Sequence, residues 1–202
     1  MKDTYRTLTA ASTGDFRDRA SKFLAYAYRA YSIKEAKAHL EVVKKLHPKA
    51  RHFCFAYRFG TDGTQFRAND DGEPSGSAGR PILGQIDSFG LSNVMVIVVR
   101  YFGGTKLGVP GLINAYKQAT IDAFNNAEME ERTVDNIYQL DFSYAVMSSV
   151  MNWVKKADLN VIEQDFGHVP VLKVAVRQRE VDAFLEGAAG VEGLEVEFLE
   201  TR

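Results

Sequence analysis

The sequence predicts an α+β protein of two domains, with a boundary near residue 130. Its 202 residues exceed the ~100 to 150 that are typical of one domain. Strand and helix signals alternate up to about residue 126, and their order changes afterwards. The charge changes at the same place, because residues 1–130 contain 18 Lys and Arg against 13 Asp and Glu, whereas residues 131–202 contain 7 against 13. We therefore expect domains over 1–130 and 131–202.

The composition is that of a soluble globular protein. Apolar residues make up 46%, enough for a core without disulfides or a metal. The single cysteine, Cys54, cannot form an internal disulfide. No apolar run reaches the roughly 20 residues that a membrane helix needs, and the first residues lack the apolar segment of a secretory signal. We expect a cytoplasmic protein without a membrane partner.

The first predicted elements are a strand and a capped helix. The aromatic-rich segment 21–28 has the composition of a strand. Ser32 followed by Glu35 forms a capping box, and apolar residues then recur at helical spacing. These signals predict a helix over 32–46.

The rest of this half predicts a hairpin, a short helix, a buried strand and a longer helix. An Asp-Gly turn joins the two arms of the hairpin. Pro81 favours the first turn of the short helix. The buried strand is almost wholly apolar and β-branched, as expected when both faces are covered. The predicted ranges are 53–59 with 65–68, 80–89, 94–99 and 111–126.

The second half predicts the order strand, helix, strand, strand, helix, strand. This βαββαβ order is that of a ferredoxin-like domain, a four-stranded antiparallel sheet with two helices on one face. The charged segment 128–136 is expected to be the linker. The predicted ranges are 137–144, 147–157, 160–166, 169–176, 179–185 and 194–199.

The loop over 69–81 is the first candidate site. It holds six side chains that could contact a ligand: Asp70, Asp71, Glu73, Ser75, Ser77 and Arg80. The three carboxylates could bind a hard cation, although the EF-hand spacing is absent. Alternatively, glycine amides and the helix N-terminus could bind an anion with Arg80. A third interpretation is a tight loop whose side chains cap its own backbone.

The loop over 100–111 is the second candidate site. Arg100, Gly103, Gly104 and Lys106 lie between a buried strand and a helix, where successive amides can point at a phosphate. The glycine spacing fits neither a Walker loop nor a dinucleotide fingerprint, and a packed tertiary contact would use the glycines equally well. We predict no cofactor.

His52 and Cys54 could share one face of a predicted strand, as two metal ligands would. No second pair lies at ligand spacing, and a histidine beside a buried thiol is more often structural. We predict no metal site. The two loops together predict one cleft lined by five charged residues: Asp71, Glu73, Arg80, Arg100 and Lys106.

Three segments resemble the IMPACT family, whose bacterial members are called YigZ-like. They are HFCFAY from His52, NDDGEPSGSAGRPI from Asn69 and RYFGGTKLG from Arg100. Ser21-Lys22-Phe23 resembles the N-terminal signature of the same family. With the second domain, the resemblance covers nearly the whole chain.

The resemblance implies an N-terminal IMPACT domain with the fold of the second domain of ribosomal protein S-five. It also implies a C-terminal ferredoxin-like domain similar to the last domain of elongation factor G. Eukaryotic relatives restrain a stress kinase of translation initiation by binding the kinase's ribosome-associated activator. The family therefore points to translation and to the stress response, and it has no established catalytic residues to carry over.

The chain departs from the family pattern at three positions. Ser77 stands where threonine is usual, which is a conservative change. Pro110 replaces a small residue, and Asn114 replaces an arginine. The change at Asn114 removes a cation from the expected anion cleft.

These observations leave three hypotheses for the function. We expect a non-enzymatic regulator that binds RNA, the ribosome or a translation factor through the basic half. The second hypothesis is an enzyme for a phosphorylated or nucleotide substrate, with Asp70, Asp71 and Glu73 as metal or acid/base groups and Lys106 on the phosphate. The third is a protein-binding adaptor.

Overall fold

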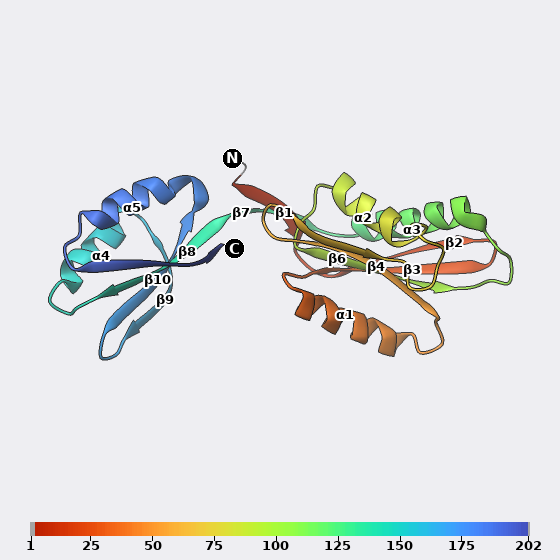
Figure 1. Cartoon of the computed structure of the whole chain (residues 1–202), viewed down its shortest axis with the longest axis horizontal. Coiled ribbons are helices and arrows are strands. Elements are labelled where there is room, and N and C mark those ends of the chain that lie inside the picture. The colour runs from red at the N-terminus through yellow and green to blue at the C-terminus, as the bar shows by residue number, and fades with distance from the viewer. Residues whose placement is uncertain (1–2, 202) are drawn as a thin grey trace. The chain divides into compact units, whose positions relative to one another are not determined.

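The computed structural model describes residues 3–201, which form two compact units (Figure 1). The N-terminal unit spans Tyr5–Arg132, and the C-terminal unit contains the residues from Thr133 onward together with Asp3 and Thr4. Both units mix helices and strands, as an α+β protein should. No helix in the described part of the chain is long and apolar enough to cross a membrane.

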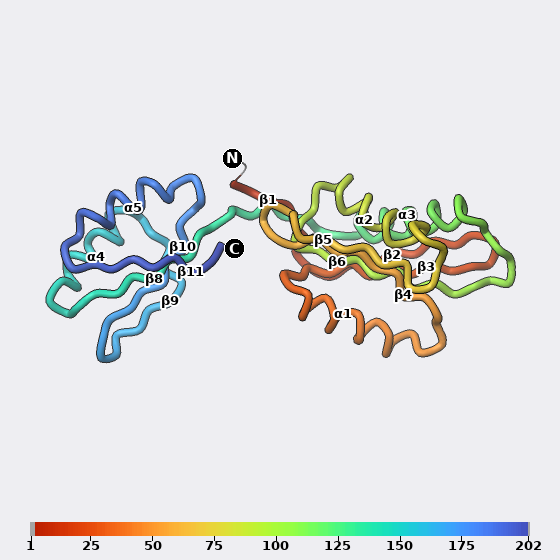
Figure 2. Tube along the Cα trace, viewed as in Figure 1, coloured from red at the N-terminus to blue at the C-terminus, as the bar shows by residue number. Residues whose placement is uncertain are grey.

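A five-stranded antiparallel sheet forms the centre of the N-terminal unit. Its strands, in spatial order, are β2 (Ser12–Asp18), β3 (Ser21–Arg29), β6 (Val94–Tyr101), β4 (His52–Phe59) and β5 (Gln65–Asn69). Helix α1 (Ile33–Leu46) covers one face, and α2 (Gly79–Ser88) and α3 (Gly108–Asn125) cover the other, as the trace in Figure 2 also shows.

The central strand β6 supplies both cores of this unit. Its side chains alternate between the two faces, and seven of its eight residues are buried. The prediction of a strand covered on both sides is therefore confirmed. Val94, Val96 and Val98 pack in the core beneath α2 and α3, and Met95, Ile97 and Val99 pack in the core beneath α1.

The starts of the helices follow from their sequences. Ser32 Oγ accepts a hydrogen bond from the Glu35 amide at 3.2 Å, and the Glu35 carboxylate accepts one from the Tyr31 amide at 3.0 Å. The predicted N-cap at Ser32 is confirmed, whereas the Glu35 carboxylate bonds to the amide of Tyr31 rather than to that of Ser32, as the capping box would have it. Helix α3 begins three residues before the predicted start, with Pro110 in its first turn. Proline is tolerated there because the first amides of a helix lack intrahelical partners anyway.

Three strands were not predicted. The segment 128–136 is not an irregular linker, because β7 (Met129–Thr133) pairs with β1 (Thr4–Leu8) in a two-stranded sheet. Three of the five residues of β7 are charged and three are exposed, so backbone pairing rather than an apolar pattern forms it. Strand β2 contains Gly14, where an added Cβ would overlap the backbone of Ala123 in α3. Glycine has a low strand propensity, which hides this strand in the sequence.

The C-terminal unit has the predicted ferredoxin-like element order. A short 3₁₀ turn (Gln178–Glu180) precedes its second helix, which begins at Val181 rather than at the predicted 179. The antiparallel strand order is β11-β8-β10-β9. The elements are β8 (Asp135–Phe142), α4 (Met147–Lys156), β9 (Asn160–Phe166), β10 (Pro170–Arg177), α5 (Val181–Ala189) and β11 (Leu194–Thr201).

Candidate functional site

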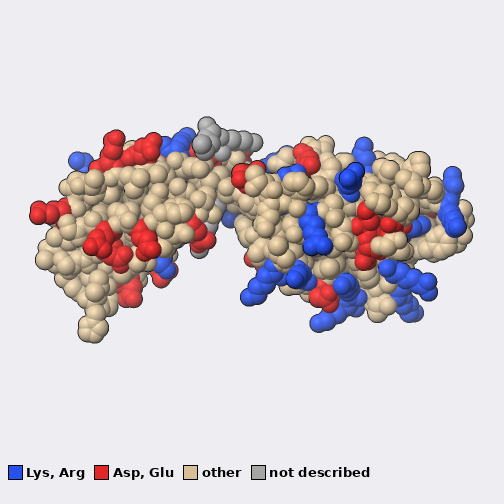
Figure 3. Space-filling model, viewed as in Figure 1, with Lys and Arg blue, Asp and Glu red and all other residues tan. Residues whose placement is uncertain are grey.

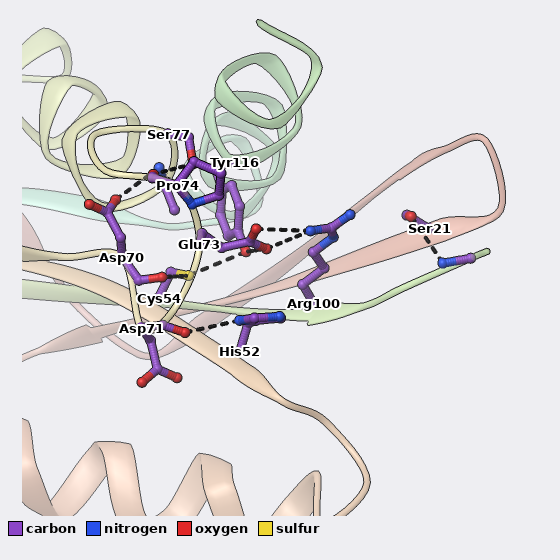
Figure 4. Close-up of polar contacts among 12 residues, drawn as sticks. Ser21, His52, Cys54, Asp70, Asp71, Glu73, Pro74, Ser77, Arg100 and Tyr116 are labelled. Carbon is purple, nitrogen blue, oxygen red and sulfur yellow. Dashed lines mark hydrogen bonds and ion pairs between the residues drawn. The ribbon is translucent and has the colours of Figure 1, made fainter. Parts of the chain in front are cut away.

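The two glycine-rich loops meet through a buried ion pair between Glu73 and Arg100 (Figure 4). Arg100 Nη1 donates to both carboxylate oxygens of Glu73, at 2.7 and 2.9 Å. The two side chains are 8% and 4% exposed, respectively. Tyr116 of α3 adds a hydrogen bond from its hydroxyl to Glu73 Oε1 at 2.8 Å. One carboxylate therefore ties the first loop to β6 and to α3.

Aromatic rings flank the guanidinium of Arg100. Its central carbon lies 5.6 Å from the ring centre of Phe23 and 5.5 Å from that of Phe102, both within cation–π range. The Nε atom is buried and has no hydrogen-bond partner among residues 3–201. Arg100 was expected to offer a surface cation. That expectation is corrected, because Glu73 already neutralises the guanidinium and the rings cover it.

Asp70 caps the start of α2 from within the loop. Its carboxylate accepts hydrogen bonds from the amides of Gly76, Ala78 and Gly79 at 2.8, 3.0 and 2.8 Å. Burial works to raise the pKa of Asp70, but these hydrogen bonds and the nearby charge of Arg80 bring it below its ordinary value. The amides that could have bound an external anion hold an internal one. This favours the interpretation of a loop that caps its own backbone.

The three carboxylates of the first loop face different partners. Asp71 Oδ2 accepts a hydrogen bond from the Phe53 amide at 2.7 Å, whereas Asp70 faces α2 and Glu73 faces Arg100. In Figure 4 the side chains of Asp70 and Asp71 point away from each other. The interpretation of a hard-cation site on these three residues is therefore wrong, because such a cation needs convergent oxygen ligands.

His52 and Cys54 hold consecutive carbonyl groups of the first loop. A hydrogen bond of 2.9 Å joins His52 Nδ1 to the carbonyl oxygen of Asp71. Cys54 Sγ lies 3.0 Å from the carbonyl oxygen of Asp70 and 3.2 Å from Tyr116 Oη, and its single proton can be donated to either oxygen. Burial raises the pKa of the Cys54 thiol and of the Tyr116 hydroxyl, so both stay protonated near neutral pH. Neither is an activated nucleophile.

The remaining candidates divide into buried and exposed groups. Ser77 Oγ is buried and donates to the Pro74 carbonyl at 2.6 Å, and Ser75 is exposed. Of the five residues expected to line one cleft, Glu73 and Arg100 meet as a buried pair. The other three, Asp71, Arg80 and Lys106, are exposed.

The glycines of the second loop serve a packed contact. An added Cβ at Gly103 would overlap the backbone of Ala20 and Ser21, and the Gly103 amide donates to Ser21 Oγ at 3.1 Å. Gly104 has a φ of +90° and open space around it. Gly103 therefore permits the close approach of two backbones, and Gly104 permits the turn.

A family model described as the Impact N-terminal domain matches residues 19–124. An IMPACT family member of Haemophilus influenzae is 32% identical over 168 residues, which are 82% of each chain. The chain belongs to the IMPACT family. Other members are YvyE of Bacillus subtilis, 31% identical over 92% of this chain and 86% of that one, and YigZ of Escherichia coli, 32% identical over 82% of each.

The chain is also similar to a eukaryotic IMPACT homologue and to a protein of solved structure. An IMPACT homologue of Saccharomyces cerevisiae is 38% identical over 97 residues, 45% of this chain and 36% of that one. A crystal structure of a hypothetical protein matches with a TM-score of 0.75 and 28% identity over 99% of both chains. The two-unit α+β fold of this IMPACT-family chain is thus shared with a solved protein over its whole length.

Tyr116, which links Cys54 to Glu73 in this IMPACT-family chain, is not among the candidate residues that the sequence predicts. A signal was present, because Leu112, Ala115, Ala119 and Tyr116 all fall on the buried side of α3. A tyrosine hydroxyl at such a position needs a hydrogen-bond partner. Which partner it finds depends on the packing of α3 against the first loop, and that packing is a tertiary property.

Proposed function

We propose that this IMPACT-family protein is a non-enzymatic regulator linked to translation, and that its N-terminal unit binds RNA of the ribosome. The family resemblance supports the link to translation. The net positive charge of residues 1–130 supports a partner that carries phosphates, because cationic surfaces attract nucleic acid independently of its sequence.

The bonding of the loop side chains favours a binding protein over an enzyme. Four candidate side chains of the two loops are bonded to the protein itself. They are Asp70, Glu73, Ser77 and Arg100. A general acid or base must reach the proton that it transfers on the substrate, and a phosphate-binding cation must be free to meet the phosphate. The loops are better explained as structural elements that stabilise the fold through contacts within the protein.

The charge that remains exposed favours the same choice. Figure 3 shows many Lys and Arg side chains over the visible face of the N-terminal unit. Residues 131–202 carry 13 acidic residues against 7 basic ones, and this unit would repel RNA rather than share in its binding. The binding function is therefore assigned to the N-terminal unit.

The test measures binding and turnover with the same preparation of the full chain. We expect the protein to sediment with ribosomes at low salt and to bind a labelled RNA hairpin, without releasing phosphate from nucleotides or sugar phosphates. Turnover without any binding to RNA or ribosomes would contradict the proposal and favour the enzyme. Capture of a translation factor by a protein that binds no RNA would favour the adaptor.

A further inference from the structure

The outer surface of α1 carries a continuous stripe of lysines. Residues 34, 37, 41, 44 and 45 recur at helical spacing and fall within roughly 100° of the helix circumference, since successive residues turn by about 100°. Four of the five are lysines, and Glu41 is the exception. We call these five residues the lysine stripe. It is about 16 Å long, at about 1.5 Å per residue.

The lysine stripe is free because another side of α1 packs on the sheet. Ala36 and Val43 are 3% and 0% exposed in the core beneath the helix, and Leu40 packs against the same core. The four lysines are all exposed. Lys44 forms an ion pair with Glu41 at 3.0 Å, but an exposed pair of this kind contributes little and leaves the lysine available.

The charge of the N-terminal unit is concentrated here. Residues 34–51 contain six Lys and Arg against two acidic residues, whereas the whole of residues 1–130 contains 18 against 13. Lys49 and Arg51 extend the lysine stripe beyond the end of α1 and are exposed. Figure 3 shows blue side chains along the lower edge of the N-terminal unit, where Figure 1 places α1.

The lysine stripe lacks the groups that read bases. It contains no aromatic side chain, although proteins that bind single strands use aromatic rings as stacking platforms. Double-stranded RNA is recognised mainly through its shape and its backbone. Cationic side chains can contact this backbone without help from aromatic rings. An anionic membrane is a poorer match. Ala36, Leu40 and Val43 pack against the sheet and cannot enter a bilayer. The exposed apolar side chains of α1 do not form one continuous face, because Ile33 lies on the other side of the stripe from Val42 and Leu46.

We propose that the lysine stripe, with Lys49 and Arg51, is the surface that binds the phosphate backbone of helical RNA. This inference rests on the proposed function and names the part of the N-terminal unit that performs it. The glycine-rich loops are not the contact surface. Glu41 lies within the stripe and opposes binding, because its carboxylate repels phosphate and competes for Lys44.

The test compares two variants of the full chain that lose the same charge. The stripe variant is Lys34→Gln, Lys37→Gln, Lys44→Gln and Lys45→Gln. The control is Arg17→Gln, Arg19→Gln, Arg67→Gln and Lys117→Gln, four exposed cations of the same unit outside the stripe. Glutamine keeps helix propensity close to that of lysine. Thermal melts of both variants check that the fold is retained.

The affinity for a labelled RNA hairpin is measured at several salt concentrations. We expect the stripe variant to bind at least about tenfold more weakly at low salt and to lose about 0.7 to 0.9 of slope per missing contact. The control should keep most of the wild-type slope, and Glu41→Gln should bind more tightly. An equal loss in both variants, or no loss in the stripe variant, would overturn the assignment of the surface. Failure of the wild type to bind RNA at all would overturn the proposed function instead.

Two further arms identify the occupant of the stripe. A single-stranded oligonucleotide should bind more weakly than the hairpin, and stronger binding of the single strand would overturn the assignment to helical RNA. Vesicles with anionic lipids should not compete with the hairpin. Competition that depends on the four stripe lysines would make a membrane the occupant.

Discussion

Arg100 at the end of β6 donates from one nitrogen, Nη1, to both carboxylate oxygens of Glu73. This contact brings two loops together that lie 27 residues apart in the chain. It also removes one cation and one anion from the surface of the candidate site. The loops that look most like a ligand site in the sequence are consequently joined to each other.

Breaking this pair from one side should be strongly destabilising. Arg100→Met leaves the Glu73 carboxylate buried with only the Tyr116 hydroxyl as a donor, and Glu73→Leu leaves the guanidinium unpaired. We expect each change to cost about 3 to 5 kcal/mol, because an uncompensated charge stays buried. The double variant should cost much less than the sum of the two. Urea unfolding of all four proteins measures this coupling, and strictly additive losses would show that the residues act independently.

Asp70→Ala should weaken the start of α2 by about 1 to 2 kcal/mol, as the loss of a helix cap does. The effect should depend on pH, because hydrogen bonds from three amides keep the pKa of Asp70 below its ordinary value of 3.8. The stabilisation is therefore present above pH 3.8 and is lost as the pH falls through the lower pKa of the folded state. Unfolding curves from pH 7 to pH 2 should converge for the two proteins at the acid end. A constant difference across that range would contradict this account.

Gly103→Ala should be far more damaging than Gly104→Ala. A Cβ at Gly103 would overlap the backbone of Ala20 and Ser21, and we expect a cost of at least about 3 kcal/mol. Gly104 has open space around it, so an added Cβ causes no overlap. Alanine there should lower the stability by about 1 to 2 kcal/mol, because it must adopt a left-handed backbone. Thermal melts of the two variants compare these costs. Equal losses would mean that the second loop is not packed against the turn at Ala20.

The fragment of residues 3–133 should fold alone and be more stable than one of residues 9–128. The longer fragment keeps the pairing of β1 with β7, which a cut at residue 130 would divide. All residues of both apolar cores of the N-terminal unit lie within 3–133, whereas the shorter fragment also loses Leu8 and Met129 from the core beneath α2 and α3. Circular dichroism and melting temperature distinguish them. An unfolded longer fragment would contradict the independence of the domain that the sequence predicts over 1–130.

The elements predicted correctly are those whose own residues carry the signal. The first six residues of β6, 94–99, are all apolar, and α1 begins at the N-cap Ser32, whose side chain accepts from the Glu35 amide. Strands β1 and β7 lack such signals, because each is held by its pairing with a segment more than 100 residues away. Long-range pairing of this kind leaves no local pattern.

The candidate site also combines features that the local sequence predicts with features that depend on long-range contacts. The sequence identifies the loops of Glu73 and Arg100 as unusual, since their composition exceeds what a connection requires. It does not show that the two side chains bond to each other, or that Asp70 folds back onto the amides of Gly76 and Gly79. The identity of a charged residue in a loop does not show whether its side chain binds a ligand or another part of the chain. The tertiary packing determines that partner.

The salt dependence of RNA binding by the full chain tests most directly whether this protein is an RNA-binding regulator. An N-terminal unit that neutralises three to five phosphates should give a slope of roughly −2 to −4.5 in a plot of log affinity against log salt, at about −0.7 to −0.9 per contact. Lys106→Ala should leave this slope unchanged if the lysine stripe of α1 makes the contacts, and should reduce it by one contact if the second loop does. Fluorescence anisotropy with a labelled hairpin supplies the curves. A slope of about −2 or steeper supports an RNA-binding regulator, whereas salt-independent or undetectable binding would contradict it.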